Sequence, residues 1–128
     1  MKELKLIIQI RRAPKDIFDF YLDPKNTPKW IDSIVTEQTN EWPPNIGTVY
    51  RNQNKSGVWS EYTVIGLEPP IMFEFQSKSS SYHVRYTLRR INADTTELEY
   101  FEWMEEGELE QPIQQYLLLH VGAALGQA

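Results

Sequence analysis

The sequence predicts an α+β domain in which a curved antiparallel sheet of about seven strands surrounds one long C-terminal helix. A strand-like segment near the N-terminus is followed directly by two short helical segments. From Thr36 to Met104, apolar and polar residues alternate, and turn-forming residues interrupt them at short intervals. The last stretch, 109–128, has helical spacing. Helices confined to the two ends of a series of strands are typical of the α+β class.

The first strand is predicted over residues 4–10, where apolar residues occupy every second position and Ile7 is the one exception. Pro14 suits the first position of a helix, because its missing N–H would have no partner there. The apolar residues that follow share one helical face: Ile17, Phe18, Tyr21 and Leu22.

Asp23-Pro24 ends this first helix, and a second helical turn is predicted from Pro28. Thr27 is expected to cap that turn, because a threonine hydroxyl can accept from a free N–H at a helix start. Trp30 and Ile34 lie on its apolar side. Both are therefore expected to face the interior.

Six further strands are predicted, because the apolar period becomes two and the turn signals fit antiparallel hairpins. Pro112 is compatible with the closing helix only in its first turn. The expected order is β-α-α-β-β-β-β-β-β-α in a single domain, 1–128. The six strands are predicted near 36–41, 47–54, 58–67, 71–77, 82–91 and 96–104.

Composition excludes several function classes. A net charge of −5 argues against a protein that follows nucleic-acid phosphates. The absence of cysteine excludes disulfides, thiol nucleophiles and thiolate metal sites. No apolar stretch approaches the length of a membrane span, and the N-terminus lacks a signal-peptide pattern, so a cytoplasmic protein is expected. No metal site or cofactor is predicted, because the glutamates at 105–110 have no nearby histidine.

In this order, the segments resemble the START-like superfamily, also called SRPBCC, which has the helix-grip fold. The matching pieces run through the chain: Ala13-Pro14 with Ile17-Phe18, Asp23-Pro24, Pro28-Lys29-Trp30, Gly47, Glu68-Pro69-Pro70 and Thr95-Thr96-Glu97-Leu98. Asp94 stands where the family pattern usually has a glycine. The resemblance implies a cavity between sheet and final helix. It does not imply one activity, because the superfamily includes lipid-transfer domains, polyketide cyclases and chaperone cofactors.

Glu102 is the residue that departs most from its surroundings, because it lies on the apolar face of the last predicted strand with Leu98 and Tyr100. It is expected either to hold a polar ligand atom or to act as a base. The alternative is a carboxylate near the cavity mouth, solvated or paired with Arg51 or Arg85. His83 is expected on the outer sheet face, solvated.

The predicted ligand cavity combines residues from the three layers of the fold. Its members are Trp30, Ile34, Tyr86, Tyr100 and Leu117, with Glu102 and His120 as the polar members. Each could instead be ordinary core, and His120 could be a packing histidine on the final helix.

The leading interpretation is a non-catalytic binder or carrier of a small hydrophobic molecule, such as a lipid, polyketide, isoprenoid or quinone. One alternative is an enzyme resembling polyketide cyclases and dehydratases, in which Glu102, Tyr100 and His120 perform acid–base chemistry. A second is a chaperone cofactor resembling the activator of the Hsp90 ATPase. Because the final helix is apolar almost all round, a homodimer through it is a further expectation.

Overall fold

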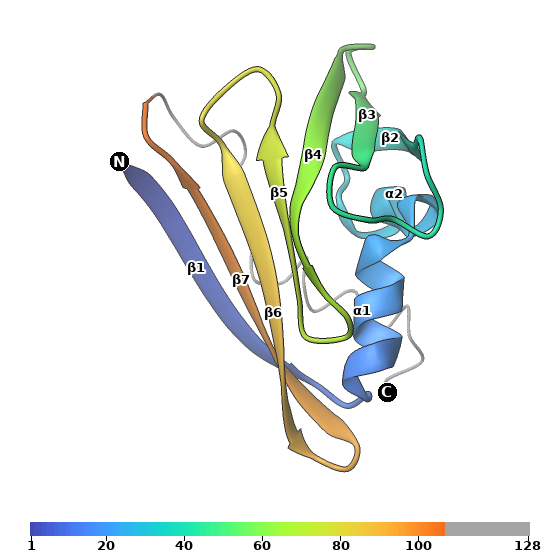
Figure 1. The fold of residues 1–128 in the computed structure, drawn as a ribbon, viewed down its shortest axis with the longest axis vertical. Coiled ribbons are helices and arrows are strands. Elements are labelled where there is room, and N and C mark those ends of the chain that lie inside the picture. The colour runs from blue at the N-terminus through green and yellow to red at the C-terminus, as the bar shows by residue number, and fades with distance from the viewer. Residues whose placement is uncertain (107–128) are drawn as a thin grey trace.

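The computed structural model describes residues 1–106, which form a curved seven-stranded sheet with short helices against it (Figure 1). All strand pairs are antiparallel, and the strand order is β1-β7-β6-β5-β4-β3-β2. The bounds are β1 Lys2–Ile10, α1 Pro14–Leu22, the 3-10 helix η1 Pro24–Asn26, α2 Thr27–Trp30, β2 Ile34–Thr39, β3 Val49–Asn54, β4 Trp59–Glu68, β5 Met72–Ser77, β6 His83–Asn92 and β7 Thr95–Met104.

The predicted strands are confirmed, and so are the two short helices. The second helix ends at Trp30, however, and Ile34, predicted on its apolar side, is the first residue of β2. The predicted long C-terminal helix lies outside the described residues.

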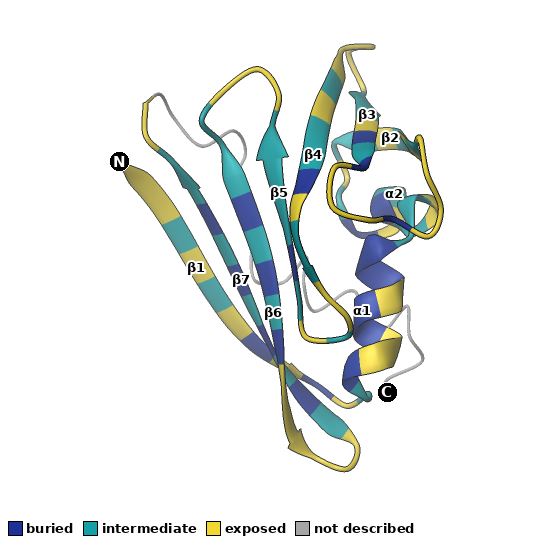
Figure 2. Ribbon diagram, viewed as in Figure 1, coloured by how far each residue is buried: buried dark blue, intermediate teal, exposed yellow. Residues whose placement is uncertain are grey.

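The core lies between α1 and the concave face of the sheet. Burial alternates along β6 and β7, where Val84, Tyr86, Leu98 and Tyr100 are buried and their neighbours in sequence are not (Figure 2). On α1 the buried side carries the apolar residues that the sequence indicated, and Phe18 meets the edge of Phe73 at 5.3 Å.

Two hydrogen bonds tie the helical segment to the sheet. The hydroxyl of Tyr50 on β3 donates to the carbonyl of Leu22 at the end of α1, over 2.8 Å. The hydroxyl of Thr96 on β7 donates to the carbonyl of Arg12, just before α1, over 2.7 Å. The first bond satisfies one of the last carbonyls of α1, which have no partner within the helix. The two bonds fix the position of α1 over the sheet.

Register shifts between paired strands change which side chains face inward. The pairing of β2 with β3 shifts register between Ile34 and Thr36, and that of β4 with β5 shifts between Val64 and Gly66. A bulge inserts one extra residue and bends the strand. At Gly66 a Cβ would come within 3.2 Å of Glu74 Cβ, which accounts for glycine there.

Candidate functional site

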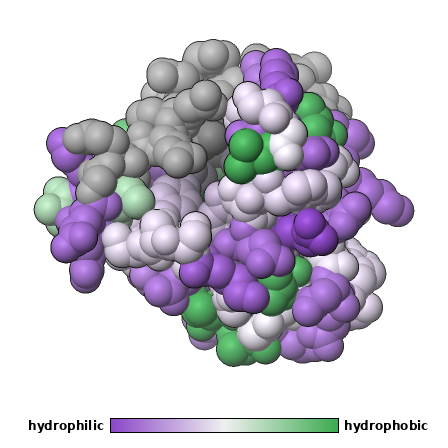
Figure 3. Space-filling model, turned by 90° about the horizontal axis from the view of Figure 1, so that it is seen from above, coloured by the Kyte–Doolittle hydropathy of each residue, from purple (hydrophilic) through white to green (hydrophobic). Residues whose placement is uncertain are grey.

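A cavity of about 790 Å³ is lined by residues of α1, α2 and strands β2 to β7. This volume is within the range of roughly 300–1,000 Å³ that small-molecule sites occupy. Among its lining residues, Lys55, Ser56, Ser79 and Ser80 are exposed and lie in the β3–β4 and β5–β6 turns. The cavity therefore opens at the end of the sheet that carries these turns. Viewed from above in Figure 3, the hydrophobic side chains of the surface form small separate groups among hydrophilic ones.

Glu102 is the most unusual residue of this cavity, because its carboxylate is only 2% exposed. Its Oε2 accepts hydrogen bonds from Tyr82, at 2.6 Å, and from Tyr100, at 2.8 Å. Its Oε1 is buried and has no hydrogen-bond partner among the described residues. A buried acceptor without a partner costs about 1–3 kcal/mol, and more if charged. Among the described residues, Oε1 is therefore an acceptor that a ligand could use.

The neighbouring tyrosines are held in their protonated form. Burial raises the pKa of Tyr82 and of Tyr100 well above 10, and the nearby carboxylate of Glu102 adds to this effect. A protonated hydroxyl can donate to the carboxylate, whereas a phenolate would repel it. Two hydroxyl donors and one carboxylate thus meet at one point of the cavity wall.

Aromatic side chains form the adjacent wall. The Trp30 ring centroid lies 5.0 Å from that of Tyr21 and 6.3 Å from that of Tyr86, and Tyr86 lies 5.2 Å from Tyr100. The Trp30 Nε1 and the Tyr21 hydroxyl are both buried without a hydrogen-bond partner among the described residues. This wall therefore offers apolar surface together with two unused polar groups, and Trp30 Nε1 can only donate.

Glu37 is a second carboxylate that lines the cavity. Its Oε1 accepts from the hydroxyl of Thr27, and its Oε2 accepts from Asn52 Nδ2 over 3.2 Å. Burial raises the pKa of Glu37, and these two hydrogen bonds act in the opposite direction. Each oxygen of this carboxylate thus has a partner, whereas among the described residues Glu102 has partners on Oε2 alone.

The structure brings most of the predicted site residues together. Five of them line the same cavity: Trp30, Ile34, Tyr86, Tyr100 and Glu102. Leu117 and His120 lie outside the described residues.

Glu102 is not paired with Arg51 or Arg85 as the alternative interpretation proposed. The guanidinium of Arg51 lies over the ring of Trp59, and Arg85 lies 3.7 Å from Glu74.

Thr27 does not cap α2 as predicted, because it is the first residue of that helix and Asn26 holds the capping position. Its hydroxyl is instead used by Glu37.

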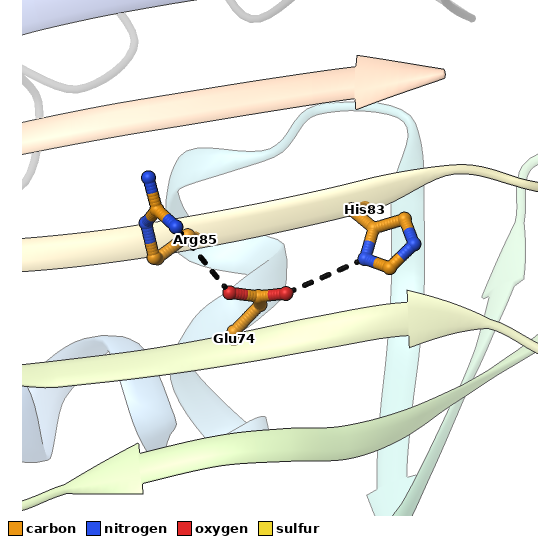
Figure 4. Close-up of polar contacts among 3 residues, drawn as sticks. All are labelled: Glu74, His83 and Arg85. Carbon is orange, nitrogen blue, oxygen red and sulfur yellow. Dashed lines mark hydrogen bonds and ion pairs between the residues drawn. The ribbon is translucent and has the colours of Figure 1, made fainter. Parts of the chain in front are cut away.

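The prediction for His83 is correct in its face but wrong in its surroundings. His83 and Arg85 lie with Glu74 on the outer sheet face, where His83 Nδ1 is 3.4 Å from a Glu74 oxygen (Figure 4). The imidazole also stacks on Trp103 at 4.7 Å, so it is partly buried rather than solvated. These contacts are those of a structural residue on the side of the sheet opposite the cavity.

Sequence reasoning missed Glu37 and the role of Tyr82. Strict alternation along β2 would place Glu37 on the face opposite Ile34, but the bulge at Ile34/Thr36 brings both into the cavity. The hydrogen bond of Tyr82 to Glu102 joins residues twenty positions apart in the sequence. No local pattern signals either feature.

Within residues 1–106, no group of His, Asp and Glu side chains is arranged to hold a metal ion. None of the helices in that part of the chain is long and apolar enough to cross a membrane. The arrangement is suited to hydrogen bonding and proton transfer at Glu102, beside an apolar wall.

No family model and no curated protein sequence matches the chain. Solved structures do match. A START superfamily protein from Mycobacterium smegmatis has 14% identity and a TM-score of 0.67, over 98% of this chain and 94% of that one. A point mutant of Thalictrum flavum norcoclaurine synthase, in complex with a transition-state analogue, has 14% identity and a TM-score of 0.69, over 97% and 91%. The Aha1 dimer from Colwellia psychrerythraea has 13% identity and a TM-score of 0.66, over 98% and 89%. The resemblance seen in the sequence is therefore confirmed at the level of the START-like fold.

Proposed function

We propose that this chain binds a small, mainly hydrophobic molecule in the cavity between its sheet and its helical segment. The observation that carries the proposal is the cavity itself, in which an aromatic wall from α1, α2 and β6 adjoins the buried carboxylate of Glu102. Burial of apolar ligand surface supplies the affinity, at about 25 cal/mol per Å². Polar groups such as Glu102 and Trp30 Nε1 set the orientation of the ligand.

The experiment fills the cavity without disturbing the core. Ser60 lines the cavity from β4, whereas Glu61, the next residue, is exposed and does not. Ser60→Phe places a ring in the ligand space, and Glu61→Phe adds the same ring outside. Native mass spectrometry of the purified proteins, followed by panels of lipids, polyketides, isoprenoids and quinones, measures ligand retention.

We expect bound ligand in the wild type and in Glu61→Phe, and its loss in Ser60→Phe with the melting temperature preserved. Equal binding by both variants would place the ligand elsewhere. If no hydrophobic molecule binds the wild type, the proposal is wrong.

A second candidate is an enzyme similar to polyketide cyclases and dehydratases. It is favoured by one observation: Tyr82, Tyr100 and Glu102 converge on a single point of the cavity wall. A carboxylate held by two protonated tyrosines can accept a proton from a bound substrate through its other oxygen.

Turnover tests this candidate. The rate at which the bound molecule is chemically converted is measured for the wild type and for Glu102→Gln. No conversion by the wild type, or the same rate for both proteins, argues against catalysis. Faster conversion by the wild type supports it. The third alternative, a chaperone cofactor, would not require a ligand cavity, and the described residues line one of about 790 Å³.

A further inference from the structure

We propose that the cavity selects ligands that carry a protonated amine, and that this amine donates to Oε1 of Glu102. The inference deepens the proposed function, on which it rests, by naming the chemical class of the ligand. It follows from the hydrogen bonds of Glu102, from the charges around the cavity and from the position of the aromatic wall.

The hydrogen bonds of Glu102 leave one oxygen for the ligand. Oε2 already receives the hydroxyls of Tyr82 and Tyr100 at 2.6 and 2.8 Å. Oε1 receives nothing from the described residues, although Glu102 is only 2% exposed. A carboxylate oxygen only accepts hydrogen bonds, so the ligand atom that meets it must be a donor. A purely apolar lipid would leave this oxygen without a partner among the described residues and the ligand.

The charges around the cavity favour a cationic donor. Both of the acidic side chains that line it, Glu37 and Glu102, reach into the space between sheet and helices. Among the described residues, the basic side chain in the lining is Lys55, which is exposed in the β3–β4 turn. Arg51 on β3 lies over the ring of Trp59, and Arg85 on β6 lies 3.7 Å from Glu74 on the outer sheet face. A ligand ammonium would supply the positive charge that the described interior lacks.

The aromatic wall lies where the rest of such a ligand would extend. Tyr100, whose hydroxyl contacts Glu102, is packed against Tyr86, and Tyr86 is packed against Trp30. Electron-rich ring faces attract cations and bury alkyl or aryl groups well. Trp30 Nε1, which has no partner among the described residues, can also donate to an acceptor on the ligand. The structure thus fits an amphipathic amine with an aryl or alkyl body.

The test compares tryptamine with tryptophol, in which a neutral hydroxyl replaces the amine on the same indole body. The amine is protonated at neutral pH, as a lysine is. Affinities for both probes are measured by isothermal titration calorimetry on the wild type, on Glu102→Gln and on Glu99→Gln. Glu99 is on the same strand as Glu102, and its carboxylate lies 3.8 Å from Lys5 on the opposite sheet face, so its substitution changes the net charge equally.

We expect the wild type to bind tryptamine about tenfold or more tightly than tryptophol, since charge-assisted hydrogen bonds are the stronger kind. The preference should disappear in Glu102→Gln and persist in Glu99→Gln. The comparison of probes on the wild type needs no variant, so it remains decisive if Glu102→Gln does not fold.

Equal affinity for the two probes, or a preference unchanged in Glu102→Gln, overturns the inference. If tryptophol or other neutral molecules bind as well as tryptamine and Ser60→Phe abolishes their binding, amine selection fails while the proposed function stands. If neither these probes nor any hydrophobic panel molecule binds, the proposed function itself fails.

Discussion

The hydrogen bonds around Glu102 give the most detailed prediction, which concerns stability. Tyr82→Phe and Tyr100→Phe each remove one hydroxyl donor and keep the ring. Hydrogen bonds to charged groups contribute about 1.5–3 kcal/mol each, and the bonds here are short, 2.6 and 2.8 Å. Each variant should therefore lower the free energy of unfolding by about this amount. The rings keep their contacts, with Tyr86 at 5.2 Å from Tyr100 and Tyr62 at 6.2 Å from Tyr82.

The double variant should cost more than the sum of the two single ones. After one substitution Oε2 keeps a donor, but after both the buried carboxylate has none among the described residues. Groups that share a partner usually show a coupling of about 0.5–3 kcal/mol. Urea unfolding followed by circular dichroism measures all four proteins, and the cycle is repeated in the Glu102→Gln background, where the coupling should shrink.

Single losses below about 0.5 kcal/mol that simply add would contradict this account. Such a result would mean that the tyrosines do not hold the carboxylate in solution.

Two further predictions concern pH. Burial raises the pKa of Tyr21, Tyr86 and Tyr100 well above 10, so their protonated hydroxyls stabilise the fold below that pH, and this contribution is lost as the pH rises through the folded-state values. As the pH is raised, tyrosinate absorbance from these residues should therefore appear in one step together with unfolding. Ionisation of all the tyrosines while the protein stays folded would refute this prediction. Burial also raises the pKa of Glu37 above 4.5, so the native protein loses stability as the pH rises from that value through the folded pKa. Glu37→Gln should gain stability relative to the wild type between about pH 4 and pH 7. Urea unfolding at these two pH values measures the difference in stability between Glu37→Gln and the wild type. A difference that is the same at both would contradict this prediction.

The strand pattern could be predicted because each strand buries one face. The ends of the predicted strands 82–91 and 96–104 lie within one residue of those of β6 His83–Asn92 and β7 Thr95–Met104. Alternation placed Tyr86, Tyr100 and Glu102 on the inner face, and the structure agrees. The start of α1 followed from Pro14 in the same way, since a proline at the first helical position has a local cause.

The rest of the site depends on register and on bulges, which alternation does not specify. Glu37 reaches the cavity because a bulge shifts the pairing of β2 against β3. The hydrogen-bond partners of Glu102 could not be predicted from the sequence, because both arginines and tyrosines lie on the predicted strands around it. The structure selects the tyrosines because Arg85 alternates to the outer face, toward Glu74.

The central claim, that the cavity binds a small molecule, is tested most directly by the indole N–H signals of the protein in ¹H–¹⁵N spectra. Trp30 is 2% exposed, and its buried Nε1 has no partner among the described residues, whereas Trp42 is 55% exposed and does not line the cavity. Each signal is assigned by a single Trp→Phe substitution. Addition of a ligand found by mass spectrometry should shift the Trp30 signal saturably, leave Trp42 unchanged and have no effect in Ser60→Phe. A saturable shift of Trp42 with Trp30 unmoved would contradict the account.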